Sequence, residues 1–223
     1  MWRRARRARR TRWARSALAG VLLGAPIGIA AQAPGRLELT VGARWSGLET
    51  GLPAAPERLR GTGLAAGLRL RIWRVTLDTR YGQATVREAG GAPGLEVVEG
   101  AASLGIQPVR WIRLEGGPQV RAYVRPNATE RWILWTGGLA TKWRIVGDGL
   151  ATYLTVWRVL AADVNTSAAR AEGYGLDGGL MARLPRVPLG VRVGYRTDRL
   201  RLDDGSRRET MQYVFMDVSV VVR

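Results

Sequence analysis

Hydrophobic and polar residues alternate one by one along most of the chain beyond residue 36. In 37–45 the odd positions hold Leu, Leu, Val, Ala and Trp, whereas the even positions hold Glu, Thr, Gly and Arg. The same alternation recurs in 63–72, 74–80, 112–115, 189–196 and 213–222. Successive side chains of a β-strand point to opposite faces, so this period of two predicts strands with one apolar and one polar face.

Two further stretches alternate less regularly. In 149–163 either face qualifies as the apolar one, and 95–107 begins with a glutamate on each face. With these included, the sequence divides into ten predicted strands. Their approximate ranges are 36–47, 61–72, 74–85, 95–107, 111–125, 131–145, 149–163, 171–184, 189–202 and 209–223.

The breaks between these segments are of two kinds that alternate along the chain. The short breaks are centred near residues 73, 109, 147 and 186, so they lie 36, 38 and 39 residues apart. The longer breaks, which are polar or rich in Gly and Pro, are 49–60, 87–94, 126–130, 165–170 and 203–208. A propeller blade would need four short strands in each repeat, whereas each repeat here supplies two long ones. The spacing therefore predicts a meander of hairpins.

An even number of long strands joined by alternating short turns and longer loops is typical of bacterial outer-membrane barrels. A tilted strand needs about 9 to 11 residues to cross a bilayer, with the short turns at the periplasmic end. The sequence thus predicts an all-β, up-and-down antiparallel transmembrane β-barrel of about ten strands, with eight as the alternative count. The barrel is expected to form a single domain over 32–223.

The first 31 residues differ from the rest. Eight arginines precede residue 16, and an apolar run over 16–31 follows, with small residues near its end. This order predicts a signal peptide over 1–31, cleaved between positions 30 and 33. The alternatives are an uncleaved anchor, a twin-arginine signal and an Arg-rich arm for nucleic acid. An anchor needs about 20 apolar residues, and an arm needs no apolar run, so we expect no nucleic-acid partner.

Composition restricts the chemistry. The chain has 223 residues, a formal net charge of +17, and neither Cys nor His. These absences exclude disulfide frameworks, Cys/His zinc sites, thiol catalysis and every mechanism with an imidazole base. We therefore expect no enzyme of a familiar kind, no metal site and no cofactor.

Seven tryptophans follow the predicted signal peptide, and all fall toward strand ends rather than strand midpoints. Indoles favour the headgroup level of a membrane, which predicts two interfacial girdles. The plain alternative is that Trp is common in β-sheets. The expected girdle residues are Trp45, Trp73, Trp111, Trp132, Trp135, Trp143 and Trp157.

If the apolar faces meet lipid, the charged faces line the lumen. The expected lumen residues are Arg44, Arg69, Arg71, Arg74, Asp78, Arg80, Glu99, Arg113, Glu115, Arg121, Lys142, Arg144, Asp177, Arg183, Arg192, Arg196 and Asp217. A small barrel is mostly filled by side chains, so a packed network of ion pairs is one interpretation. The other is that surplus arginine attracts anions and forms a narrow anion path or a site for an acidic ligand.

With its signal peptide, hairpin spacing and two-residue periodicity, the chain resembles the small outer-membrane β-barrel proteins of Gram-negative bacteria over essentially all of 32–223. The resemblance implies an export apparatus, insertion by the barrel-assembly machinery, a targeting strand at 214–222 and a place in the outer membrane. The chain departs from that family by ending on Val221, Val222 and Arg223 instead of an aromatic residue. The similar ten-stranded omptin proteases require a His, which this chain lacks.

Two functions are consistent with these patterns. The first is a porin-like outer-membrane barrel with a structural or interaction role, or with limited passage of small anions. The alternative is a soluble periplasmic or secreted barrel of lipocalin type that binds an apolar or acidic ligand. The two functions require opposite orientations of the strand faces. In the soluble barrel the apolar residues point inward and the arginines face water, whereas in the membrane barrel the apolar residues face lipid.

Overall fold

The computed structural model describes residues 35–52, 55–88, 94–147, 149–165, 170–184 and 187–222. The predicted signal peptide and its cleavage site lie outside these residues. In the described part of the chain, no helix is long and apolar enough to cross a membrane.

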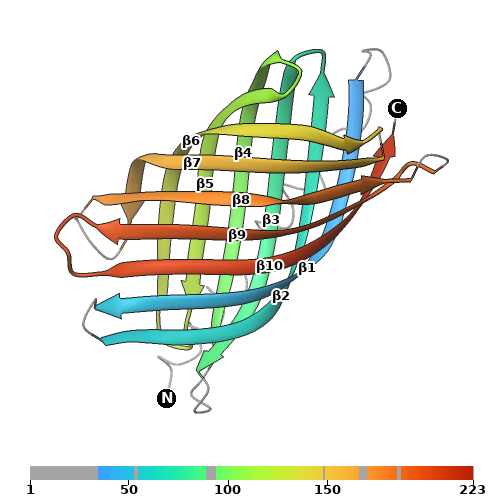
Figure 1. Ribbon diagram of the computed structural model, residues 1–223. Helices are drawn as coiled ribbons and strands as arrows, with labels where there is room; N and C mark the ends of the chain where they lie inside the picture. The colour runs from blue at the N-terminus through green and yellow to red at the C-terminus, as the bar shows by residue number, and fades with distance from the viewer. Residues whose placement is uncertain are drawn as a thin grey trace, which may run out of the picture. The chain divides into compact units, whose positions relative to one another are not determined.

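Ten antiparallel strands form a closed barrel (Figure 1). They are β1 (Gly35–Leu52), β2 (Ala55–Ile72), β3 (Val75–Glu88), β4 (Leu95–Val109), β5 (Ile112–Val124), β6 (Thr129–Val146), β7 (Leu150–Val164), β8 (Ala171–Arg183), β9 (Leu189–Leu202) and β10 (Arg208–Val222). Each strand pairs with its neighbours in the chain, and β1 pairs with β10 to close the cylinder. The all-β, up-and-down barrel and the count of ten are therefore confirmed.

The two ends of the barrel are built differently. One end, called the turn end here, carries the connections at 73–74, 110–111, 147–149 and 184–188, together with the start of β1 and the end of β10. The opposite end, called the loop end, carries the other five connections. In Figure 1 the strands of the near wall cross those of the far wall, as the strand tilt of a closed barrel requires.

The predicted long break at 49–60 is wrong. β1 continues to Leu52 and β2 begins at Ala55, so most of this stretch forms a hairpin. Its Gly and Pro residues conceal the alternation, but Leu48 and Leu59 both point inward and oppose each other across the ladder. On the β2 side the hairpin extends beyond β3, since β2 pairs with β3 only from Leu59 onward. Proline is tolerated in this segment because no described residue of β3 pairs with it.

A β-bulge explains the irregular alternation of 149–163. Thr136 pairs with Val159, but Trp135 pairs with Ala161, so β7 carries one extra residue, Leu160. Such an insertion moves every later side chain to the other face. The inward set of β7 therefore changes from odd to even positions along the strand, and no single face is apolar throughout.

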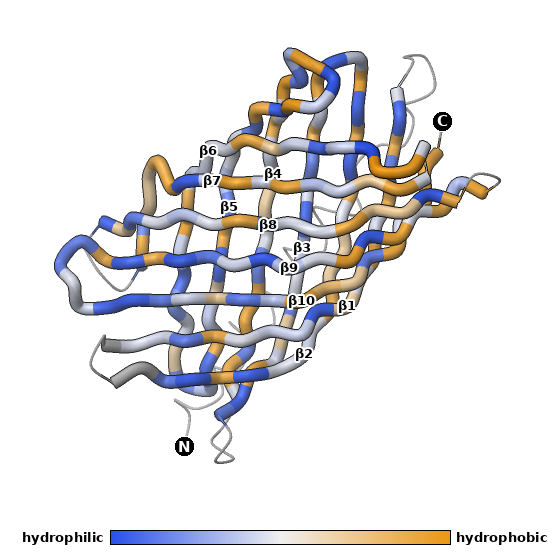
Figure 2. The backbone as a smooth tube through the Cα atoms, in the orientation of Figure 1, coloured by the Kyte–Doolittle hydropathy of each residue, from blue (hydrophilic) through white to orange (hydrophobic). Residues whose placement is uncertain are grey.

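The outer wall is apolar in its part toward the turn end. Large hydrophobic side chains such as Val41, Leu64, Leu104, Val193 and Val214 are each about half exposed or more. In Figure 2 the half of β10 toward the C-terminus is hydrophobic, and the half near the β9–β10 loop is hydrophilic. A soluble barrel would need the opposite faces, with water-exposed arginine on this wall.

Candidate functional site

The barrel interior contains many charged side chains, and it has three layers. An apolar plug lies toward the loop end, two networks of ion pairs follow, and a chamber opens at the turn end. Each layer arises because alternate positions of every strand point inward.

The plug consists of inward side chains that are almost fully buried. Its members are Leu48, Leu59, Val86, Leu95, Val97, Tyr123, Trp132, Leu134, Val159, Val164, Ala171, Leu200, Leu202, Met211 and Tyr213. Residues of this size fill the space inside a small barrel. The plug therefore closes the lumen on the loop side.

Arg121 is the centre of the first network, directly beneath the plug. Its side chain is completely buried and runs from β5 to the opposite wall. The guanidinium donates to Glu99 at 2.8 Å, to Glu209 at 2.8 Å and to Asp198 at 2.6 Å. Arg44 and Arg196 complete a set of three cations and three carboxylates. A buried ionic group of this kind is tolerated only when every member is paired.

Aromatic hydroxyls donate further hydrogen bonds to this network, and the second oxygen of Glu209 has Arg207 at 3.7 Å. Tyr213 donates to Glu99 at 2.8 Å, and Tyr123 donates to Glu209. Arg44 and Arg196 also lie over the ring of Tyr213, 5.1 and 5.7 Å from its centroid. The carboxylates, guanidiniums and rings thus form one continuous unit across the barrel.

Arg207, in the loop between β9 and β10, covers the plug from outside. It donates to Glu130 and to the Thr50 hydroxyl at 3.2 Å, and it lies over the rings of Tyr123 and Trp132. Burial alone would lower the pKa of Arg207, but the hydrogen bond to Glu130 and the nearby Glu209 raise it. This guanidinium therefore stays charged and ties the loop to the strands.

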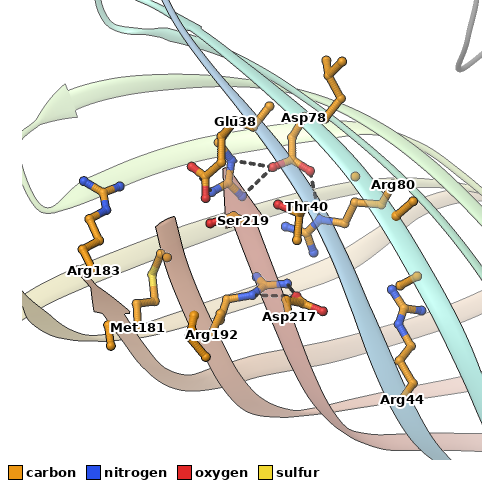
Figure 3. Close-up of a pocket in the computed structure, with 18 residues that line it drawn as sticks. Glu38, Thr40, Arg44, Asp78, Arg80, Met181, Arg183, Arg192, Asp217 and Ser219 are labelled. Carbon is orange, nitrogen blue, oxygen red and sulfur yellow. Dashed lines mark hydrogen bonds and ion pairs between the residues drawn. The ribbon is translucent and has the colours of Figure 1, made fainter. Parts of the chain in front are cut away.

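A second network crosses the middle of the barrel (Figure 3). Asp78 accepts hydrogen bonds from Arg69 at 2.7 Å and from Arg80 at 2.9 Å. Arg80 also reaches Asp177 on the opposite wall at 3.8 Å.

The same layer contains further partners for these charges. Asp217 accepts a hydrogen bond from Arg192 at 3.0 Å, and Tyr153 donates to Asp177 at 2.8 Å. A cavity of only about 50 Å³ remains in this layer. The middle of the barrel is therefore nearly filled and balanced in charge.

The turn end is open. A cavity of about 1060 Å³, called the turn-end chamber here, is lined by inward side chains and by residues of three turns. Its cationic lining residues are Arg36, Arg69, Arg71, Arg80, Arg110, Arg113, Lys142, Arg144, Arg183 and Arg192. Glu38 is the one acidic residue among the described lining residues. Charge, apolar packing and open space are thus separated along the barrel axis.

Sixteen of the seventeen expected lumen residues face the interior or line the chamber. Arg74 is the exception. It lies in the turn between β2 and β3, where its guanidinium is 5.1 Å from the centroid of the Trp73 ring. The ladder ends at Ile72 and Val75, so Arg74 no longer follows the alternation of the strand.

The expected tryptophan girdle is wrong for two members. Trp132 is fully buried in the plug, and its indole donates to Glu130 at 2.6 Å. Trp157 also points inward, with Arg196 at 4.4 Å from its ring centroid. Each lies on the strand face that points into the barrel. This position decides where the side chain lies, despite the general preference of indole for a membrane interface. The other five, Trp45, Trp73, Trp111, Trp135 and Trp143, are exposed, and Trp111 also lines the turn-end chamber.

Sequence reasoning missed Asp198 and Glu209, the two acids that Arg121 contacts across the barrel. The alternation could have identified them, because Asp198 lies an even number of positions after Arg192 and Arg196 and therefore on the same face of β9. Continuing the inward face of β10 back from Tyr213 likewise leads to Glu209.

In the described part of the chain, no group of three or more acidic side chains is arranged to hold a metal ion. The inward carboxylates instead face guanidiniums, which already supply their positive charge.

The sequence matches no family model and no curated protein. Among solved structures, the translocator domain of the autotransporter NalP from Neisseria meningitidis is 13% identical, with a TM-score of 0.49 over 93% of this chain and 97% of that one. LpxR from Salmonella typhimurium is 9% identical, with a TM-score of 0.46 over 82% and 99%. Neisserial surface protein A is 12% identical, with a TM-score of 0.38 over 82% and 96%. These proteins are outer-membrane β-barrels, and what this chain shares with them is the barrel fold.

Proposed function

We propose that this protein is an outer-membrane β-barrel with a structural or interaction role, exported with a signal peptide and inserted by the barrel-assembly machinery. The observation that carries the proposal is the reversal of polarity between the two faces. Exposed hydrophobic side chains cover the outer wall, whereas guanidiniums and carboxylates are enclosed. A closed barrel pairs the backbone groups of its strands, and its apolar outer side chains are stable against lipid chains but not against water.

The closed loop half favours a structural or interaction role over an open pore. The plug and both ion-pair networks stand between the turn-end chamber and the loop end. A permanently open channel would need a continuous aqueous path, as larger barrels have. We propose no catalytic activity. The chain lacks the His that the omptin proteases require and the Cys that thiol catalysis needs.

Limited passage of small anions is the second candidate, favoured by the cations around the turn-end chamber. Passage would require the loop half to open. In planar bilayers we then expect small, intermittent currents that prefer anions. The combined substitutions Arg69→Ala, Arg113→Ala and Arg192→Ala should reduce that preference. Silence of the unmodified protein would rule out passage and leave the structural role.

Fractionation of expressing cells tests the membrane location. The protein should be recovered with the outer membrane, and heated and unheated samples should migrate differently in electrophoresis, because the closed barrel survives detergent until it is boiled. Recovery in the soluble fraction, with no effect of heating on mobility, would contradict the proposal.

The outer wall supplies a matched pair of variants for the same question. Val218→Arg places a charge at the centre of the apolar outward run of β10, where we expect membrane insertion to lose about 2–4 kcal/mol. Gln212→Arg, the third outward position from Val218 toward the loop end, should lose at most about 1 kcal/mol. Equal folding of both variants into vesicles would contradict a lipid-facing wall at Val218.

A further inference from the structure

Among the residues that the structure describes, cations outnumber acids around the turn-end chamber. Ten cationic side chains line it. The described acids that belong to this half are five, namely Glu38, Asp78, Glu115, Asp177 and Asp217. Five positive charges therefore remain in excess among the residues that the structure describes. In contrast, the network around Arg121 is balanced.

The excess cations lie around the mouth, not in the ion-pair layer. Arg69, Arg80 and Arg192 contact the three aspartates of the middle layer. Arg71, Arg110, Lys142 and Arg183 lie nearer the turns, on different strands and connections around the circumference. In Figure 3 Arg183 projects without a dashed contact to the residues drawn, whereas Asp78 and Asp217 are each held by arginine.

Two of these cations face each other directly. Arg36 on β1 and Arg71 on β2 are register partners, and both side chains line the chamber. Like charges opposite each other on adjacent strands are destabilising. Both side chains thus add to the positive charge around the mouth of the chamber.

The chamber also has the depth and the electrostatics of a binding site. Its inner end is formed by the middle network, where Asp78, Asp177 and Asp217 are buried. Low-dielectric walls around a cleft of one sign of charge concentrate the field and draw in counter-ions. The volume of about 1060 Å³ is slightly above the range for small-molecule sites, about 300–1,000 Å³.

We propose that the turn-end chamber binds a small solute that carries several phosphate groups. All but one of the lining cations are arginine, and the guanidinium fork matches the oxygens of phosphate in pairs of parallel hydrogen bonds. A monovalent anion would offset only part of the excess, whereas cations from β1, β2, β6 and β8 converge on a multivalent one. The inference goes beyond the structural role and does not require transport, since the chamber is closed on its inner side.

Calorimetric titration of the purified protein with tripolyphosphate tests the proposal, in micelles of a detergent that carries no phosphate. We expect saturable binding that weakens as salt is added. The double substitution Arg71→Gln and Arg183→Gln should weaken it about a hundredfold, because two charge-assisted hydrogen bonds to the ligand are lost and each accounts for about tenfold. The matched control is Arg158→Gln with Arg199→Gln, which removes the same charge from exposed outward positions and should leave the affinity unchanged.

Three results would overturn the proposal. The first is no binding by the unmodified protein, and the second is an equal loss in the chamber and control variants, which would indicate attraction by net charge alone. The third is citrate binding as tightly as tripolyphosphate, which would exclude phosphate as the ligand class. If the chamber variant fails to show heat-dependent mobility, Arg110→Gln with Lys142→Gln replaces it. The mobility assay reports the barrel and the titration reports the chamber, so the two proposals fail separately.

Discussion

The loop half and the turn half of the barrel follow the same strands but enclose different interiors. In the loop half the inward positions hold large apolar side chains and a balanced ionic network around Arg121. In the turn half the inward positions hold mostly cations around open space. The comparison shows that the period-two pattern decides which residues point inward, whereas the identity of those residues decides whether the lumen is filled.

The two halves also differ in how their charges are used. Arg121 contacts three carboxylates within 2.8 Å and is completely buried. Arg71, in the turn half, is exposed at the rim and donates to the backbone oxygen of Trp73 at 3.2 Å. We therefore expect Arg121 to stabilise the folded barrel and Arg71 to attract a ligand.

The largest expected effect is the loss of Arg121. Arg121→Ala leaves Glu99, Asp198 and Glu209 buried without their shared cation, and breaking a buried ionic group in this way costs about 3–5 kcal/mol. Urea unfolding of the refolded protein in micelles measures the change in the free energy of unfolding. Arg183→Ala, in the turn half, should change it by less than about 0.5 kcal/mol. Similar losses in both variants would remove the distinction between the halves.

A glycine substitution gives the next largest effect. A Cβ on Gly194 would lie 2.5 Å from the Tyr153 hydroxyl and 2.7 Å from the Phe215 ring, so Gly194→Ala should destabilise the barrel by about 1–3 kcal/mol. Gly149 lines the chamber, and its nearest neighbour would be 3.7 Å away. Gly149→Ala should therefore be nearly neutral in the same unfolding measurement. A neutral Gly194→Ala would mean that the middle of the barrel is less filled than the structure indicates.

The smallest expected effect has the opposite sign. Arg71→Thr removes one of two like charges that face each other at the turn end, and it should raise the free energy of unfolding by about 0.2–1 kcal/mol at low ionic strength. The gain should fade as salt screens the remaining charges. A decrease in stability, measured in the absence of multivalent anions, would show that Arg71 has a structural role in the rim.

The alternation in the sequence was enough to predict the ten strands, the closed meander and the inward face, because a one-residue slip would expose the whole charged set. It failed where a local feature interrupts the period. The extra residue at Leu160 concealed the faces of β7, and Pro and Gly concealed the hairpin between Leu48 and Leu59.

The division of the interior was harder to predict, because it depends on contacts between strands that are far apart in the chain. Arg121 and Glu209 are 88 residues apart in sequence, yet they are hydrogen-bonded across the barrel. The alternation placed Arg121 inside, but Glu209 was missed, and the alternation does not show that the two residues lie at the same height along the barrel axis. The buried position of Trp132 likewise follows from its place among the plug residues, not from any property of indole.

The most direct test of the closed loop half and the open turn half uses the absence of native cysteine. Val97→Cys places a thiol in the plug, and Ala140→Cys places one on the chamber wall. With a water-soluble, negatively charged thiol reagent, Ala140→Cys should react rapidly in the folded barrel, and Val97→Cys should react on the order of a hundredfold more slowly until the protein is unfolded. Equal rates for the two folded variants would contradict the account.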